Sequence, residues 1–278
     1  MTGLPIPSTP DGREGLAALL GDPRDALLGF DFDGTLAPIV DDPAAAHAHP
    51  DAPAALAVLA DRVALIAIVT GRPASQAVAL GGFADVPGLE RLVVLGQYGV
   101  ERWDLNSKVA VVPEPPAGLD AVRSQLPRLL DVMGLPDAHI EDKGIAVAVH
   151  VRRMDDPAAA FRELHAPLAA LAMRNGLSLE PGRLVLELRA EGMDKGQALQ
   201  GLLRESGART VMFVGDDLGD EAAFDAVDEF RAEGGFGLLV CAGSIEQNAL
   251  VERSDLVVDG PTGVVALLRT LADAMPKP

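Results

Sequence analysis

The sequence predicts an α/β fold with a parallel sheet and an inserted α+β module. Short apolar runs without polar alternation recur between segments with helical spacing, which is typical of strands covered on both faces. This alternation of strand and helix stops at the prolines of 113–116 and resumes after Gly192. We therefore expect a discontinuous core of residues 1–112 and 191–278 around an insert of residues 113–190, with a ligand site in the cleft between them.

The composition excludes several classes of protein. The 278 residues, of which 49% are hydrophobic and 23% charged, suffice for about two globular domains and are unlike a disordered segment. The net charge of -18 repels nucleic-acid phosphates, so we expect no nucleic-acid partner. The single cysteine cannot form an internal disulfide, and no apolar run approaches the roughly 20 residues of a membrane span. We expect a cytoplasmic monomer without an export signal.

The first part of the core is expected to contain buried strands separated by helices. Residues Ala26–Phe30 form the first apolar run, which Pro23 and Asp31 delimit. Asp51 stands where an N-cap is needed, and Pro53 lies near the first turn of the helix that would follow. The expected strands are 26–30, 63–69 and 92–95, and the expected helices are 11–20, 51–60 and 73–80.

The insert is expected to alternate helix and hairpin. Lys143-Gly144 and Pro181-Gly182 each separate two short strand-like runs, as the turn of a hairpin does. The expected elements of the insert are helices 119–132 and 157–175 and strands 138–142, 145–151, 177–180 and 184–188. In the resumed core they are helices 195–206 and 221–226 and strands 210–214 and 237–240.

Carboxylates follow two of the expected core strands. Asp31 and Asp33 come directly after 26–30, and Asp216, Asp217 and Asp220 come after 210–214. Parallel α/β sheets bind ligands at the carboxyl ends of their strands, so both clusters belong at one edge. Carboxylates packed together repel one another unless a hard cation lies between them, and Mg2+ is the usual cation for oxygen ligands. The sequence therefore predicts a Mg2+ site, although aspartates in turns and helix caps would give similar local patterns.

Two further residues have ambiguous local patterns. Thr70 follows the expected strand 63–69 and offers a hydroxyl to a phosphate, but an isolated Thr-Gly is also a common turn. Lys195 begins an expected helix, where the helix dipole favours an anion rather than a cation. This placement suggests that Lys195 binds an anion, and a solvated surface lysine is the alternative.

The order of these residues resembles that of the four motifs of the haloacid dehalogenase-like phosphatases, which here would be Asp31-Phe-Asp33-Gly-Thr35, Thr70, Lys195 and Gly215-Asp216-Asp217 with Asp220. The resemblance implies a Rossmann-like core with an inserted cap. It implies that Asp31 is a nucleophile that forms an aspartyl phosphate, and that Asp33 is the general acid and then the general base. Thr70 and Lys195 would hold the phosphoryl oxygens.

The same resemblance implies the ligands of Mg2+. They would be Asp31, the backbone carbonyl of Asp33 and Asp216, assisted by Asp217 and Asp220. A proton donor two residues after the nucleophile favours hydrolysis of alkyl phosphate esters, because an alcohol leaves poorly as an alkoxide.

The insert resembles the cap of trehalose-6-phosphate phosphatases, in Glu141-Asp142-Lys143, in His150 with Arg152 and in Leu186-Glu187-Leu188-Arg189. The substrate-binding residues that this resemblance implies are Arg72, Glu141, Lys143, Arg152, Glu187 and Arg189. The chain departs from that family at Thr70, where the family usually has Ser, and at Gly219, where it usually has Thr. Taken alone, 141–144 would fit a solvated hairpin turn equally well, and His150 would fit a packed strand residue.

The resemblance implies hydrolysis of trehalose 6-phosphate to trehalose and inorganic phosphate, a step of trehalose biosynthesis. The sequence itself shows no substrate, so another sugar phosphate, such as sucrose phosphate or a glycosyl phosphoglycerate, stays open. A phosphomutase would use the same acid pair. A signalling module switched by a phosphorylated aspartate would also combine acids, Thr and Lys around Mg2+, but a simple receiver domain lacks such an insert.

Overall fold

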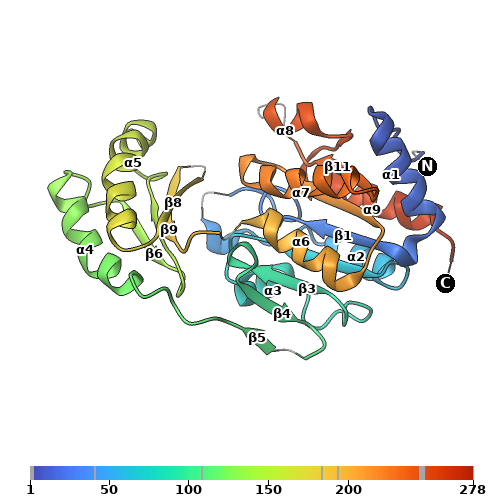
Figure 1. Ribbon diagram of the computed structural model, residues 1–278, viewed down its shortest axis with the longest axis horizontal. Coiled ribbons are helices and arrows are strands. Elements are labelled where there is room, and N and C mark those ends of the chain that lie inside the picture. The colour runs from blue at the N-terminus through green and yellow to red at the C-terminus, as the bar shows by residue number, and fades with distance from the viewer. Residues whose placement is uncertain are drawn as a thin grey trace. The chain divides into compact units, whose positions relative to one another are not determined.

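The computed structural model describes residues 3–40, 42–107, 109–182, 184–192, 194–243 and 248–277. The chain divides into two compact units (Figure 1). Met1–Val112 and Asp194–Pro278 form the first, which we call the core unit, and Pro113–Met193 form the second, which we call the inserted unit. Within the described ranges, no helix has the length and apolarity that crossing a bilayer requires.

A sheet of eight strands forms the centre of the core unit, in the order β12-β11-β10-β1-β2-β3-β4-β5. The strands are β1 (Ala26–Phe30), β2 (Leu65–Val69), β3 (Val93–Gly96), β4 (Glu101–Asp104), β5 (Val109–Val111), β10 (Thr210–Gly215), β11 (Phe236–Cys241) and β12 (Leu256–Val257). Strands β12 to β3 are parallel, as the sequence predicts, and β4 and β5 extend the sheet in antiparallel fashion. The predicted parallel sheet is therefore confirmed, and β4 and β5 add an antiparallel hairpin at this edge, which the sequence did not predict.

Helices cover both faces of this sheet. They are α1 (Pro10–Gly21), α2 (Ala52–Ala60), α3 (Ala74–Gly81), α6 (Lys195–Ser206), α7 (Glu221–Ala232), α8 (Asn248–Arg253) and α9 (Gly260–Ala274), with short 3-10 turns η1 (Pro23–Asp25), η2 (Pro43–Ala45), η3 (Gln97–Gly99) and η4 (Leu218–Asp220). The α7 helix extends six residues beyond the predicted 221–226, and α8, α9 and β12 were not predicted. Asp51 does not cap α2 with its side chain, which instead pairs with Arg269 at 3.0 Å.

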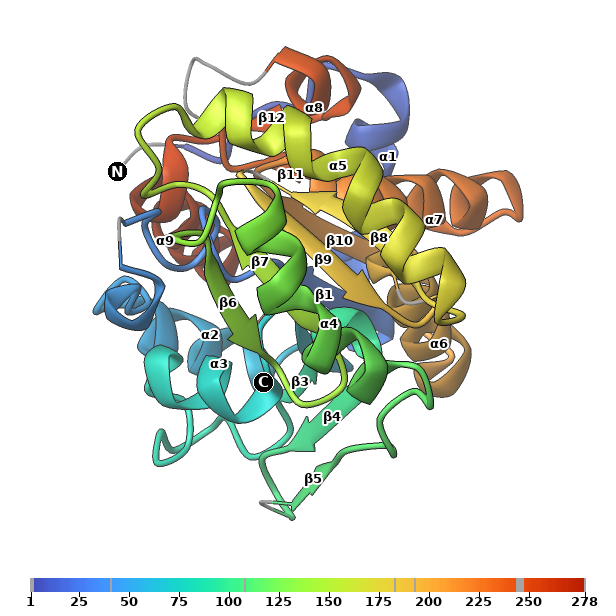
Figure 2. The same cartoon turned by 90° about the vertical axis from the view of Figure 1, so that its left-hand side faces the viewer.

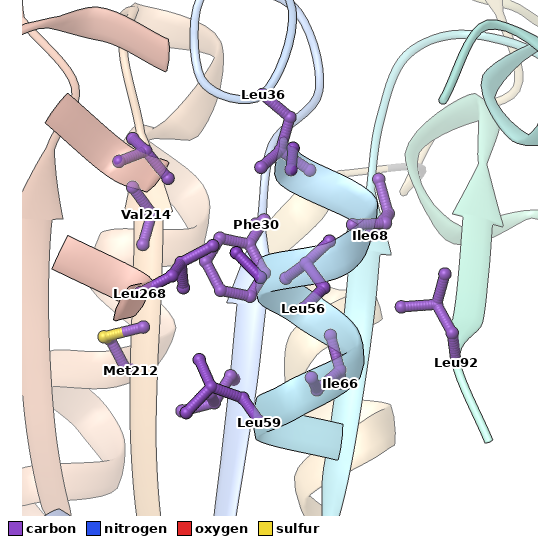
Figure 3. Packing of buried hydrophobic residues seen from close by; sticks show 14 of the residues in the cluster. Phe30, Leu36, Leu56, Leu59, Ile66, Ile68, Leu92, Met212, Val214 and Leu268 are labelled. Atoms are coloured by element: carbon purple, nitrogen blue, oxygen red, sulfur yellow. The ribbon is translucent and has the colours of Figure 1, made fainter. Parts of the chain in front are cut away.

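The central strand β1 shows how the two faces divide the core. All of its residues are buried, and alternate side chains enter different clusters. Leu28 and Phe30 pack with residues of α1, α2, α3 and α9, as Figure 3 shows for Leu56, Leu59 and Leu268. Leu27 packs on the other face with residues of α6, α7 and α8. Because both faces are covered, the strand needs no polar alternation, which is why its apolar run was recognisable in the sequence.

The inserted unit is a four-stranded antiparallel sheet with two helices (Figure 2). The strands are β6 (His139–Asp142), β7 (Val147–His150), β8 (Ser178–Gly182) and β9 (Val185–Arg189) in the order β6-β7-β9-β8, and the helices are α4 (Leu119–Val132) and α5 (Pro157–Arg174). The predicted hairpins both form, but Pro181 and Gly182 belong to β8, so the turn was predicted too early. Leu184, next to the turn, adopts a left-handed φ of 59°.

Direct helix-to-strand contact in the core unit gives a stability prediction. A Cβ on Gly15 of α1 would lie 1.8 Å from the carbonyl oxygen of Gly237 in β11, whereas a Cβ on Gly21 of the same helix would meet nothing within 4 Å. Gly15→Ala should therefore lower the free energy of unfolding by about 1–3 kcal/mol, because the backbones must separate. The matched control Gly21→Ala should leave it unchanged or raise it by up to about 1 kcal/mol. Urea unfolding of both variants measures the difference, and equal effects would contradict the close packing of α1 on β11.

Candidate active site

Three buried carboxylates converge at the carboxyl ends of β1 and β10. Asp31 follows β1 and Asp216 follows β10, and the backbone N–H of Asp31 donates to the carbonyl of Val214 at 2.8 Å. Asp220 ends the η4 turn. Asp31, Asp216 and Asp220 are 5%, 6% and 0% exposed, and each places a carboxylate oxygen within 4.8 Å of the others. The two acidic clusters that the sequence separates by more than 180 positions thus share one site.

Gly34 is needed for this convergence. Its φ of 80° is left-handed, and a Cβ at this position would lie 2.0 Å from Oδ2 of Asp216. The glycine therefore both permits the turn after Asp33 and leaves room for the Asp216 carboxylate against the backbone. The turn is closed by the N–H of Gly34, which donates to the carbonyl of Ala37 at 2.7 Å.

Lys195 lies inside the acidic site. Its Nζ is 2.7 Å from Oδ1 of Asp31 and 2.7 Å from Oδ1 of Asp220, and the residue is 4% exposed. The alternative of a solvated surface lysine is therefore wrong. Asp194 caps the α6 helix by accepting from the N–H of Gln197 at 2.8 Å, which leaves the side chain of the first helical residue to enter the site.

Asp220 and Asp217 also organise the loop after β10. Oδ2 of Asp220 accepts from the backbone N–H of Asp216 at 2.9 Å, so Asp220 fixes both Lys195 and the loop that carries Asp216. Asp217 lies outside the buried triad, and its Oδ1 accepts from the N–H of Gly219 at 2.8 Å as the cap of η4. Of the expected metal ligands, Asp31, Asp216 and Asp220 thus bring their carboxylates together, and Asp217 lies outside this group.

The electrostatics of the site fit a divalent cation. Burial, together with the neighbouring Asp31, Asp217 and Asp220, raises the pKa of Asp216 to about 10. Burial also raises the pKa of Asp31 and Asp220, although Lys195 opposes this shift. For Lys195, burial lowers the pKa, but Asp220 and Asp31 outweigh burial and leave that pKa raised. One lysine cannot balance three carboxylates, and oxygen ligands suit Mg2+, so the residues present fit this ion.

Arg72 donates two hydrogen bonds to the carboxylate of Asp33. Its Nε and Nη2 each lie 2.6 Å from one oxygen of the Asp33 carboxylate, and its guanidinium lies 5.7 Å from the centre of the Phe32 ring. Arg72 is 9% exposed, and its backbone N–H donates to Oγ1 of the buried Thr70 at 3.2 Å. Such bidentate pairs fix orientation as well as charge. The structure thus places Arg72 beside the expected acid and base, where it orients that carboxylate.

Glu101 is a supporting residue that the sequence analysis did not single out. Its buried carboxylate accepts from the N–H of Ala74, at the start of α3, at 2.7 Å and from Nε2 of Gln97 at 2.8 Å. The N–H groups of Gln97 and Tyr98, which have left-handed φ values of 46° and 60°, donate to the carbonyls of Arg72 and Thr70. Glu101 therefore holds together the segments around Thr70 and Arg72. A lone Glu in a short, mostly polar strand gives no sequence signal of this role.

The remaining expected residues lie in the inserted unit, and those within its strands share one face of the sheet. Val147, Val149, Leu186 and Leu188 pack into the cluster with α4 and α5. Because side chains alternate along a strand, Glu141, His150, Glu187 and Arg189 lie on the opposite face.

The polar groups of this face are paired with one another. Nζ of Lys143 contacts Oε2 of Glu187, His150 lies 2.7 Å from Glu141, and Arg189 lies 3.6 Å from Glu180. Glu187 is 3% exposed, and its Oε1 accepts no hydrogen bond from any described residue. A buried acceptor without a hydrogen bond is uncommon in folded proteins. Arg152 follows β7 and also belongs to this unit.

Solved structures show the same fold. The chain matches the C. albicans trehalose-6-phosphate phosphatase C-terminal domain with a TM-score of 0.73 and 22% identity, covering 98% of this chain and 99% of that one. A haloacid dehalogenase-like hydrolase from Bacteroides thetaiotaomicron matches with a TM-score of 0.57 and 16% identity, over 88% of this chain and 98% of that one. The sheet and the insert thus have the fold of haloacid dehalogenase-like proteins.

The sequence comparisons narrow this class. The family model described as trehalose-phosphatase matches residues 29–257, and the chain belongs to that family. A trehalose-phosphate phosphatase of Mycobacterium avium is 36% identical over 228 residues, which are 78% of this chain and 54% of the relative. A trehalose-6-phosphate phosphatase of Escherichia coli is 30% identical over 158 residues, which are 56% of this chain and 57% of the relative. The chain thus spans little more than half the length of these relatives.

Removal of divalent metal is expected to make stability fall as the pH rises. In metal-free protein the folded state keeps protons on Asp31, Asp216 and Asp220 at pH values where the unfolded carboxyls have lost them. Because the folded state binds more protons, its stability should fall from roughly pH 5 upward until the pH passes the pKa of about 10 of Asp216. Melting temperatures in EDTA should show this slope, and Mg2+ should raise them more at pH 8 than at pH 6.

The control for this prediction is Asp216→Asn. Asparagine has no carboxyl proton to lose, so the metal-free slope should become shallower and the stabilisation by Mg2+ should shrink. A metal-free melting temperature that stays level or rises between pH 6 and pH 8 in the unmodified protein would contradict the raised pKa values.

Proposed function

We propose that this protein is a Mg2+-dependent phosphatase that hydrolyses trehalose 6-phosphate to trehalose and inorganic phosphate in trehalose biosynthesis. The observation that carries the proposal is the buried cluster of Asp31, Asp216 and Lys195 at the carboxyl ends of β1 and β10, in a chain of the trehalose-phosphatase family. Membership of that family supports the substrate, and the carboxylate–lysine cluster supports the chemistry.

In the first step the carboxylate of Asp31 attacks phosphorus as the ester P–O bond breaks. The alkoxide that leaves takes a proton from Asp33, which lies two residues further along the chain than Asp31. In the second step Asp33 accepts a proton from water, which attacks the phosphoaspartate and releases inorganic phosphate. The two hydrogen bonds from Arg72 hold the carboxyl group of Asp33 in one orientation for both proton transfers.

The charge of the phosphoryl group needs compensation at this acidic edge. Lys195, which already contacts Asp31, and the buried Thr70 would hold phosphoryl oxygens. Asp31, the backbone carbonyl of Asp33 and Asp216 would hold Mg2+, with Asp217 and Asp220 beside them; the ion supplies positive charge that lets a carboxylate approach a phosphate.

The polar face of the inserted unit suits the sugar. Trehalose is an uncharged polyol, and charged groups form charge-assisted hydrogen bonds to its hydroxyls. Glu187 offers a buried acceptor without a partner among the described residues. The full set that we assign to substrate binding is Glu141, Lys143, Arg152, Glu187 and Arg189 of the inserted unit, with Arg72 of the core unit. Thus the inserted unit would act as the cap that selects the sugar, while the core unit performs the chemistry.

We propose further that the protein acts on a small molecule as a cytoplasmic monomer and has no nucleic-acid or membrane partner. Its net charge of -18 supports the absence of a nucleic-acid partner, because so acidic a surface repels phosphate backbones.

Release of inorganic phosphate from trehalose 6-phosphate tests the proposed reaction. Release is expected in Mg2+ and is expected to stop in EDTA, with recovery when excess Mg2+ is returned. Sucrose 6-phosphate, glucosyl 3-phosphoglycerate and glucose 6-phosphate serve as competing substrates, and the highest kcat/KM identifies the sugar. A preference for one of these would replace trehalose 6-phosphate, and conversion of glucose 1-phosphate to glucose 6-phosphate without phosphate release would indicate a mutase.

Substitutions of the two aspartates after β1 separate their roles. Asp31→Asn should lower kcat more than about 10³-fold, because the amide is not a nucleophile. Asp33→Asn should slow trehalose 6-phosphate hydrolysis by about 10²–10⁴-fold, since a general acid contributes about that much. Phosphoryl transfer from p-nitrophenyl phosphate should suffer less in Asp33→Asn, because nitrophenolate leaves without a proton.

The readouts for these variants are initial rates and the mass of the trapped phosphoenzyme. Melting temperatures serve as the folding control, because Asp31 pairs with Lys195. Steady turnover by Asp31→Asn would refute the nucleophile. Equal losses of Asp33→Asn in the rate of phosphoenzyme formation from the two esters would refute the acid, because the base acts only after the phosphoenzyme has formed.

A further inference from the structure

A histidine of the inserted unit contacts one of the carboxylates assigned to the sugar. In the antiparallel pair of β6 and β7, Glu141 lies opposite Ala148 and His139 lies opposite His150. Glu141 and His150 are therefore diagonal neighbours on one face, and Nε2 of His150 lies 2.7 Å from Oε2 of Glu141. Core packing does not explain this contact, because Val149 and Val151 carry the apolar packing of this segment on the other face.

The chemistry of the two side chains determines which of them donates this hydrogen bond. An ionised carboxylate can only accept, so Nε2 carries the proton whether the imidazole is neutral or charged. The side chains of His150 and Glu141 are 26% and 34% exposed, so the pair is partly buried and remains accessible to solvent. A flexible glutamate in such a place would sample several rotamers, and a hydrogen bond to a strand residue restricts it to one.

The carboxylate of Glu187, on the same face of the sheet, also has a nitrogen donor beside it. Ala148 of β7 pairs with Glu141 of β6 on one side and with Glu187 of β9 on the other, so the two glutamates flank one small residue. Lys143 contacts Glu187, as His150 contacts Glu141. Each carboxylate of the row thus has its own nitrogen donor, which is the arrangement expected when both must keep a fixed direction.

We infer that His150 is a positioning residue that orients Glu141 for hydrogen bonding to the sugar part of the substrate. This inference rests on the proposed function, because it needs Glu141 to contact a sugar hydroxyl. His150 itself neither touches the phosphoryl group nor transfers a proton in the reaction. Its loss should weaken sugar binding in the ground state and in the transition state alike, which raises KM and leaves kcat nearly unchanged.

The test compares three variants by steady-state kinetics on trehalose 6-phosphate. His150→Leu removes the donor and should raise KM about tenfold with kcat within about twofold. His150→Gln places an amide N–H near the position of Nε2 and should keep KM within about threefold of the unmodified protein. His139→Leu is the matched control, since His139 lies opposite His150 in the same strand pair, 5.8 Å away between ring centres, and should leave KM unchanged.

Calorimetric binding of trehalose gives a readout that does not need turnover. The dissociation constant should rise about tenfold in His150→Leu and recover in His150→Gln, with all melting temperatures within about 2 °C. Equal KM values for the unmodified protein and His150→Leu, or equal losses in the Leu and Gln variants, would overturn the positioning role. If the protein binds trehalose but does not hydrolyse trehalose 6-phosphate, the proposed function is wrong, and the binding measurements still test the role of His150. If the protein neither binds trehalose nor hydrolyses trehalose 6-phosphate, both the proposed function and the role of His150 are overturned.

Discussion

Negative charge buried at the carboxyl ends of β1 and β10 is the constraint on which the rest of the structure depends. Asp31, Asp216 and Asp220 are almost inaccessible to water, and charges in such surroundings are costly unless they are compensated. Lys195 supplies part of that compensation from the first position of α6. The raised pKa values show that the compensation is incomplete. A site that is still short of positive charge is suited to a cation with oxygen ligands.

The same constraint explains the arrangement of the neighbouring backbone. Gly34 lets the Asp216 carboxylate lie against the turn after Asp33, and Asp220 uses its second oxygen to hold the N–H of Asp216. One layer further out, Arg72 fixes Asp33, and Glu101 ties together the segments that carry Arg72 and Thr70. The carboxylate of Asp33 and the backbone of Asp216 are thus each held by a neighbouring polar side chain, which restricts their conformations. The row of glutamates in the inserted unit follows the same rule.

Parts of the fold could be predicted because their signals are local. The strand Ala26–Phe30 and the helices Leu119–Val132 and Lys195–Ser206 have the predicted bounds, since an apolar run or a helical period with clear ends identifies them. The antiparallel strands β4 and β5 escaped prediction because Glu101–Asp104 is mostly polar, so that pairing with β3 rather than an apolar pattern stabilises it. The turn near Pro181 was misplaced for a related reason, since the register with β9 sets where β8 ends.

By itself, the sequence determined which residues are available for chemistry and the order in which strands deliver them, because acids placed directly after buried parallel strands must reach the same edge of the sheet. It did not determine the partner of each charged group. Only the tertiary structure decided that Lys195 lies between Asp31 and Asp220, that Arg72 holds Asp33, and that His150 holds Glu141. These pairs join residues from different strands and helices, and their distances depend on strand register and side-chain direction, which no local pattern of residues encodes.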